Sequence, residues 1–306
     1  MLKNRCQIAC EIEATEGTAE TLVAADVFLA FNPSFEPVIE PHEREAKASS
    51  LSPFPSVFGA RSAKMSFDAE LVGDASAGQS IHFVDALRAC GFAETIVGGT
   101  SATYLPASSS VPSVTLAMYL DGKIYKMWGA RGTVRLELVK GQAGIFHFEF
   151  TGADWSESDG SLLSGVSLHA TLPPAFQGAQ LTIDSYSALV DRVEIDIANT
   201  VALRPDANAS SGHKSAVITA RRPTLSFDPE NVLVATEDFL GNWRSGSQMA
   251  FTTTIGSATG NTIAVTAPKV QYQDVKLAER EGISTLEIES LLCRSSGDDE
   301  VQVQIT

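Results

Sequence analysis

The chain has 306 residues, enough for one large or two ordinary domains, and 44% of them are apolar while only 19% are charged. Its net charge of −15 argues against nucleic-acid binding through phosphate neutralisation, which needs a basic surface. No run of about 18 apolar residues occurs, so we expect no membrane-spanning helix.

The start of the chain and its cysteines bear on the compartment. Residues 7–20 contain glutamates where a signal peptide would be apolar, so we do not expect a cleaved signal peptide. The cysteines form no CxxC pair, and we interpret them as reduced structural residues of a protein made in the cytoplasm. They are Cys6, Cys10, Cys90 and Cys293.

Apolar and polar residues alternate in several stretches, which is the period of half-buried β-strands. In chain order, strands are predicted at residues 64–71, 134–138, 145–151, 192–198 and 301–305. Asp121 and Gly122, between the apolar runs 114–120 and 123–128, predict a β-hairpin.

Other segments predict helices and loops. Short helices are expected at residues 80–90, where Gly91 stops the pattern, and at 238–244. Residues 36–59 contain four prolines and no clean period, so they predict a long loop. Residues 152–165 are rich in Gly, Ser and Asp and separate the two halves. We therefore predict an all-β protein with a minor helical part.

A faint internal repeat suggests two similar units. Residues 60–70 (ARSAKMSFDAE) and 220–230 (ARRPTLSFDPE) match at six of eleven positions. Later, residues 144–150 resemble 282–288, at a shorter spacing of 138 residues instead of 160. We predict two tandem β-sandwich domains with one short helix each, at residues 1–152 and 176–306, joined by a linker at 153–175.

The sequence offers little to catalysis or metal binding. The five histidines, at 42, 82, 147, 169 and 213, have no metal-ligand spacing among themselves or with cysteines. No nucleophile elbow, Walker loop or dinucleotide-binding glycine pattern is present. We therefore predict no catalytic residue, no cofactor site and no metal site, and no enzymatic activity.

A series of weak motifs in residues 1–152 resembles one protein family. In order, they are an acidic stretch after a basic start (2–17), an Asn-Pro-Ser step (26–35), a Gly-x-Arg strand (59–71), Arg-x-x-Gly-Phe (88–92), a Tyr-Leu-Asp-Gly hairpin running into Gly-Ala-Arg-Gly (119–132), and Phe-x-Phe-x-Phe-x-Gly (146–152). This order is similar to that of tail tube (major tail) proteins of long-tailed, non-contractile bacteriophages. The second half lacks the Asp-Gly hairpin and the Phe-x-Phe-x-Phe strand.

The resemblance implies a structural subunit of the virion tail, assembled in the bacterial host cytoplasm. Family members are β-sandwiches with a helix, and they form stacked rings around a channel that conducts DNA during ejection. Two copies of the fold per chain would make the ring a homotrimer with pseudo-sixfold symmetry. The implied partners are other copies of the chain, a tape measure protein in the lumen, and tail terminator and tail-tip proteins at the ends. Genomic DNA would pass without specific binding.

Two further interpretations concern surfaces. The resemblance implies that loop 36–59 contacts the next ring, and Leu51, Phe54, Val57 and Phe58 are the candidate inter-ring residues. Alternatively, Phe54 and Phe58 fold back on their own sandwich. A different class of function also stays open, namely a β-sandwich adhesin or receptor-binding module of a virion or cell surface.

Overall fold

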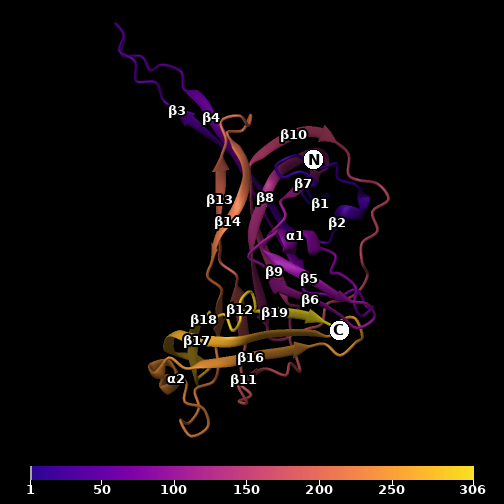
Figure 1. Cartoon of the computed structure of the whole chain (residues 1–306), viewed down its shortest axis with the longest axis vertical. Coiled ribbons are helices and arrows are strands. Elements are labelled where there is room, and N and C mark those ends of the chain that lie inside the picture. The colour runs from indigo at the N-terminus through magenta and orange to yellow at the C-terminus, as the bar shows by residue number, and fades with distance from the viewer. Residues whose placement is uncertain (1) are drawn as a thin grey trace.

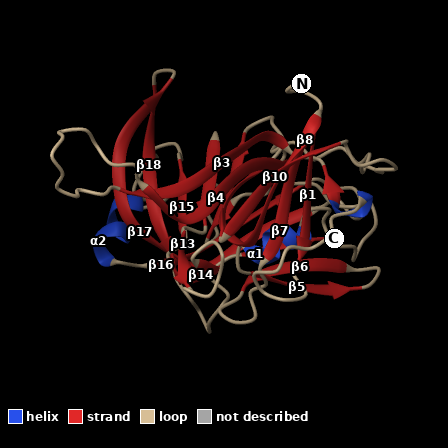
Figure 2. Cartoon of the chain, turned by 90° about the horizontal axis from the view of Figure 1, so that it is seen from above, coloured by secondary structure: helices blue, strands red, loops and turns tan. Residues whose placement is uncertain are grey.

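The computed structural model describes residues 2–306, of which about 52% lie in strands and 5% in helices, so the predicted all-β class with a minor helical part is confirmed. Strands fill most of the molecule, with α2 at one side (Figure 2). The elements of the first half are β1 (Cys6–Ile12), a 3₁₀ turn (Ala24–Asp26), β2 (Val27–Phe28), β3 (Phe31–His42), β4 (Val57–Glu70), α1 (Val84–Ala89), β5 (Phe92–Val97), β6 (Ser101–Pro106), β7 (Val114–Leu120), β8 (Gly122–Val139), β9 (Ile145–Gly152) and β10 (Asp154–Gly160).

The second half contains fewer strands and a second short helix. Its elements are β11 (Thr182–Ile183), β12 (Arg192–Asp196), β13 (Asn199–Pro205), β14 (His213–Arg221), β15 (Thr224–Phe227), α2 (Phe239–Ser245), β16 (Gln248–Ile255), β17 (Ile263–Arg280), β18 (Ile283–Leu292) and β19 (Gln302–Ile305). Figure 1 shows this half at the lower end of the molecule, apart from the hairpin β13–β14, which rises beside β8. No helix within residues 2–306 has the length and apolar character needed to cross a membrane.

Most of the predicted elements are found. The hairpin is formed by β7 and β8, with Leu120 opposite Lys123, and Gly122 in the turn adopts a φ of +108° that favours glycine. The first helix is shorter than predicted and begins only at Val84. Ile81 and Phe83 before it are buried, and the Ile81 N–H is bound by the Tyr104 hydroxyl at 2.9 Å, so these residues enter the core without joining the helix.

The predicted loop 36–59 is wrong at both of its ends. β3 runs on to His42 and β4 begins at Val57, so only residues 43–56 connect them. Prolines hid strand β3, because Pro33, Pro37 and Pro41 break the usual signal. Pro is tolerated there because β3 is an edge strand that pairs only with β4 among the described residues. At the predicted linker 153–175, β10 forms a strand that pairs with β8.

The same order of strand pairing occurs twice. In the first half, β4 pairs with β9, β9 with β8, β8 with β7 and β10, and β7 with β1. In the second half, β15 pairs with β18, β18 with β17, β17 with β16 and β19, and β16 with β11. The second set has no counterpart of the hairpin β5–β6 within residues 2–306, which accounts for the shorter spacing of the second sequence block.

The pairing also corrects the alignment of the second block. Phe67 lies opposite Phe148, whereas Phe227 lies opposite Ile288. The counterpart of Phe148 is therefore Ile288 and not Leu286, because the turns after β8 and β17 differ in length and β17 has a bulge between Tyr272 and Asp274. Phe67 and Phe227 are both buried, as expected for the apolar face of each strand.

The two halves share one continuous sheet and one hydrophobic core. β12 pairs with β8 and β19 pairs with β6, so the sheet of the second half continues into the first. Buried residues of both halves, including Phe67, Phe148, Phe227 and Phe251, form one contiguous hydrophobic cluster. The strands of the two halves are thus fixed relative to one another by backbone hydrogen bonds as well as by packing.

Candidate assembly surface

Eight strands from the two halves form one antiparallel row. Their order is β3, β4, β9, β8, β12, β15, β18 and β17. Each half contributes four strands in equivalent order, and the pair β8–β12 joins the two sets. Within residues 2–306, β3 at one end has no second neighbour, and the C-terminal part of β17 at the other end pairs only with β18. The row is therefore open at both ends.

One side of this row is packed on the core and the other is polar, because successive side chains point to opposite faces. We call the second side the polar face. Its carboxylates outnumber its basic side chains. The acidic members are Glu36, Asp68, Glu70, Glu137, Glu149, Glu194, Asp196, Asp274, Glu287 and Glu289, and the basic members are Lys64, Arg131, Arg135, Arg192, Lys276 and Arg280.

Charges on the polar face are paired across the strand joint β8–β12. Arg192 of β12 lies 2.9 Å from Glu137 of β8, and Arg135 of β8 lies 3.2 Å from Glu194 of β12. His147 of β9 contacts Glu137 at 3.1 Å with Nε2. Each such exposed pair contributes about 1 kcal/mol or less, so these contacts fix register more than they stabilise the fold.

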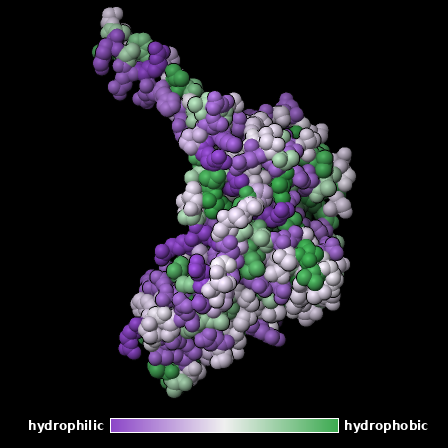
Figure 3. Space-filling view, in the orientation of Figure 1, coloured by the Kyte–Doolittle hydropathy of each residue, from purple (hydrophilic) through white to green (hydrophobic). Residues whose placement is uncertain are grey.

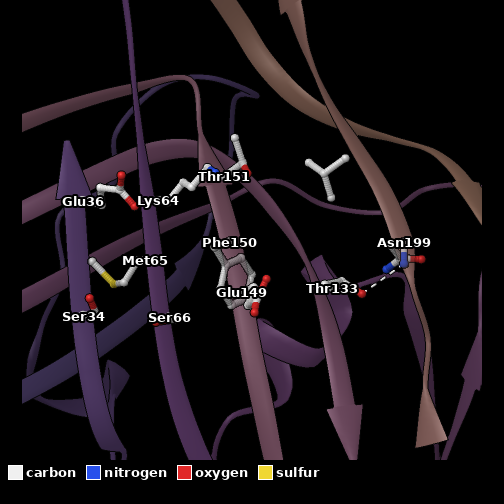
Figure 4. A pocket seen from close by; sticks show the side chains of 11 residues that line it. Ser34, Glu36, Lys64, Met65, Ser66, Thr133, Glu149, Phe150, Thr151 and Asn199 are labelled. Carbon is white, nitrogen blue, oxygen red and sulfur yellow. Dashed lines mark hydrogen bonds between the residues drawn. The ribbon is translucent and has the colours of Figure 1, made fainter. Parts of the chain in front are cut away.

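A groove of about 370 Å³ lies on the polar face beneath β13 (Figure 4). Glu36 and Lys64 stand on one side of it, Glu149 projects from the middle strand, and Asn199 comes from β13. The Asn199 N–H donates to the Thr133 hydroxyl at 3.0 Å. The lining carries charges of both signs but no nucleophile hydrogen-bonded to a base, so it offers no arrangement for covalent catalysis.

Two hairpins project from the sheet as arms. The first arm is β3 and β4 with residues 43–56, and the second arm is β13 and β14 with residues 206–212. Figures 1 and 3 show the first arm extending beyond the rest of the molecule. The second arm lies against the first half, where the Arg61 N–H donates to the Ser211 carbonyl at 3.0 Å and Ser215 and Ala216 are fully buried.

The four predicted inter-ring residues lie at or near the tip of the first arm. Leu51 is fully exposed, Phe58 is 72% exposed, Val57 is 55% exposed and Phe54 is 36% exposed. Phe54 is covered only in part, by the Arg44 guanidinium 5.8 Å from its ring centre. The alternative in which both phenylalanines fold back on their own sandwich is not what the structure has. We call these four side chains the tip residues.

Comparison with known families decides the class of protein. The family model of the phage tail tube protein matches residues 3–306. The chain belongs to the phage tail tube protein family. No curated protein matches the sequence. A tail tube protein is a structural component of the virion tail, and it assembles into a tube with other tail components. The family match therefore favours the tail tube interpretation over the alternative of an adhesin or receptor-binding module.

Among the other polar groups within residues 2–306, no reaction centre is recognisable. No three His, Cys, Asp or Glu residues within 2–306 come together as a metal-binding group. The rings of His82 and His169 are stacked with their centres 4.1 Å apart, and the Asp74 carboxylate lies 3.2 Å from Nε2 of His82. Burial and the neighbouring His82 lower the pKa of His169. Cys10 and Cys90 are buried and their pKa values are raised by burial, which makes these thiols unreactive.

Sequence reasoning found the tip residues but missed the polar face as a unit and the two open sheet ends. The alternation of β4, β8, β9 and β12 did mark the polar side chains of this tail tube protein strand by strand. Nothing in that alternation says which strands are neighbours, so the continuous acidic surface appears only once the pairings are known.

Proposed function

We propose that three copies of this chain close into a ring with pseudo-sixfold symmetry, and that such rings stack into the tube that conducts phage DNA. Each chain supplies two copies of one fold, divided near residues 153–175. The observation that carries the proposal is the eight-strand row, which repeats a four-strand set and is open at both ends. A ring is the arrangement in which every such end finds a partner.

The polar face lines the channel in this proposal. Its excess of carboxylates repels the phosphates of DNA, so genomic DNA slides past without specific binding. Before DNA enters, the lumen holds the tape measure protein, and terminator and tail-tip proteins bind the two ends of the tube. Assembly takes place in the host cytoplasm. The chain performs no catalysis, and its function is mechanical.

Negative-stain microscopy with ring averaging, together with mass photometry of single rings, tests this proposal. Purified chain should give hollow tubes or stacked rings, and a single ring should have the mass of three chains. Sixfold symmetry of whole chains would contradict the trimer. Monomers at every concentration, without rings, would contradict the assembly itself.

We further propose that the tip residues of the first arm bind the next ring. The arm extends beyond the body of the chain and exposes Phe58 and Leu51, which is costly unless a neighbour covers them. Each phenylalanine buried at the contact contributes about 1.5–3 kcal/mol. The prediction is that Phe54→Ser with Phe58→Ser leaves the chain folded but prevents ring stacking.

Circular dichroism, thermal melting and microscopy on this double variant measure folding and stacking separately. Leu172→Ser serves as the control, because Leu172 is 81% exposed and lies outside the arm. Rings without tubes in the double variant, and normal tubes in the control, support the contact. Normal tubes in both would exclude the arm as the inter-ring contact, and an unfolded double variant would place the phenylalanines in the core.

A further inference from the structure

The two open ends of the eight-strand row carry exposed backbone and an exposed apolar side chain. Residues 274–280 of β17 pair only with β18 within the described chain, and unpaired strand edges are normally covered in folded proteins. Leu277 is 73% exposed although it lies opposite Leu286, which is 1% exposed on the core side of the sheet. An apolar side chain on the core side stays exposed here because the strand that would flank it is missing.

The joint between β8 and β12 inside the chain shows what such an edge looks like when it is filled. Ile195 of β12 lies opposite Leu136 of β8, and both are buried. The next pair is Asp196 opposite Arg135, which places opposite charges on neighbouring strands. The ladder continues with the Ile197 N–H donating to the Val134 carbonyl at 3.1 Å.

The repeated pairing gives each residue of this joint an equivalent at the open ends. The row Phe67, Phe148 and Val134 in the first half corresponds to Phe227, Ile288 and Val275 in the second. Two residues further along β8 and β17, Leu136 therefore corresponds to Leu277, and Arg135 to Lys276.

The free strand β3 matches β12 in the same way. Phe35 faces Met65 of β4, as Ile195 faces Leu225 of β15. Phe35 is thus equivalent to Ile195, and Glu36 to Asp196. Phe35 is held in position by Tyr125 and Trp155, whose ring centres lie 5.3 and 6.2 Å from its own.

We propose that β3 of one chain pairs antiparallel with residues 274–280 of a second copy, with Phe35 opposite Leu277 and Glu36 opposite Lys276. The proposal rests on the proposed ring and specifies its joint. The occupant is a second copy because this chain carries both halves of the match, an apolar pair and a charge pair with the same polarity as in the internal joint. Lys276 contacts Asp274 on its own strand at 2.7 Å, and pairing gives it Glu36 as well.

The prolines of β3 limit what else can bind this edge. Pro37 is equivalent to Ile197 and has no N–H to donate, and Pro33 lacks one as well. On this edge Phe35 keeps its N–H, and the carbonyl oxygens remain as acceptors. A strand that relies on a full backbone ladder therefore binds poorly, so side-chain complementarity selects the partner.

Cross-linking tests the register directly. Glu36→Cys combined with Lys276→Cys places two thiols on paired residues, where Cα atoms about 4.5–5.5 Å apart permit a disulfide. Glu36→Cys with Ala278→Cys is the matched control, because Ala278 lies on the same face two residues away, about 7 Å along the strand. Assembled rings are oxidised and analysed on denaturing gels without reductant, beside the single variants.

The first pair should give covalent dimers and trimers, and the control pair and single variants should stay monomeric. Rings that form without cross-links, or equal cross-linking in the control, would overturn this joint while leaving the ring itself intact. Absence of rings in the unmodified chain removes the ring and the joint together.

If the cysteine variants do not assemble, charge reversal tests the pairing of Glu36 with Lys276. Glu36→Lys alone and Lys276→Glu alone should each reduce ring yield at least tenfold at low salt, and the double reversal should restore it. Lack of restoration, with all three variants folded, would also overturn the joint.

Discussion

The two arms of the chain are hairpins at equivalent places in the repeated sheet, yet their surroundings differ. The second arm lies on the first half, and its Ser215 and Ala216 are fully buried. It is held by charged hydrogen bonds, because Glu16 accepts from Arg204 at 3.1 Å and from the Ser215 hydroxyl at 2.9 Å, and Arg131 donates to the Ala216 carbonyl. The first arm projects into solvent and carries apolar side chains at its tip. The difference supports the proposal that the first arm, like the second, is covered by a neighbouring surface, which the next ring would supply.

The same contrast holds for the strand edges. Leu136 at the filled joint is 4% exposed, whereas its equivalent Leu277 at the open edge is 73% exposed. Substitutions at these equivalent sites should therefore differ in their effect on the unassembled chain, and the largest effects belong to the filled joint.

Leu136→Ala should lower the free energy of unfolding of the unassembled chain by about 2–5 kcal/mol, because it removes buried apolar atoms and leaves a cavity. Leu277→Ala should change it by about 0.5 kcal/mol or less, because its side chain is already in water. Denaturant titration at a concentration too low for assembly measures both. Equal losses would mean that Leu277 is covered within its own chain and that the edge is not open.

The sequence predicted the strands whose burial alternates, and it missed what depends on neighbours. Residues 64–71 and 145–151 were found because Phe67 and Phe148 point into one core while Asp68 and His147 point out. β3 was hidden by prolines that an edge strand tolerates. The second repeat block was placed two residues off, because Gly144 and Gly282 close turns of different length.

Of the two candidate contact surfaces, one could be predicted from the sequence and the other could not. The tip residues could be chosen from sequence because apolar side chains among prolines and serines are unusual in a loop. Leu277 could not be chosen, because its strand alternates like that of Leu136. Only the absence of a flanking strand, a property of topology, distinguishes the exposed leucine from the buried one.

Docking of the second arm should depend on Arg131 and on pH. Arg131→Leu should cost about 1–3 kcal/mol, because it leaves the Val111 and Ala216 carbonyls without their side-chain donor and removes one of the donors to the Glu16 carboxylate. Burial raises the pKa of Glu16, but hydrogen bonds from Arg131 and Ser215 outweigh it and hold that pKa below its usual value. Because the pKa of Glu16 is lower in the folded chain, its ionised carboxylate stabilises the docked arm at pH values above the unfolded-state pKa of about 4.3. This stabilisation is lost as the pH falls through the folded-state pKa.

Hydrogen exchange of residues 206–216 between about pH 3 and 6, corrected for the intrinsic rate, measures this effect. Protection should fall at the acid end in the unmodified chain, and Glu16→Gln should give weaker protection with little dependence on pH. The first arm is the internal reference, since residues 43–56 should exchange rapidly at every pH. Protection of the second arm that is independent of pH in the unmodified chain would show that Glu16 does not hold it.

The smallest effect concerns the two helices, which differ as the arms do. α1 is held by packing, with Ala86, Leu87 and Ala89 buried and no side-chain cap, whereas α2 buries only Phe239. Asp238 caps α2 by accepting from the Gly241 N–H at 2.8 Å. Asp238→Ala should therefore lower the free energy of unfolding by about 1 kcal/mol, and Asp238→Asn, which keeps a capping oxygen, should lower it by a few tenths at most.

Asp85→Ala in the first turn of α1 should lower the free energy of unfolding by about 0.5 kcal/mol or less, because its 3.8 Å contact with Arg88 is a surface pair. Denaturant titration of the three variants checks the order. A loss at Asp85 as large as at Asp238 would show that α1 also depends on its terminal charge and is not held by packing alone.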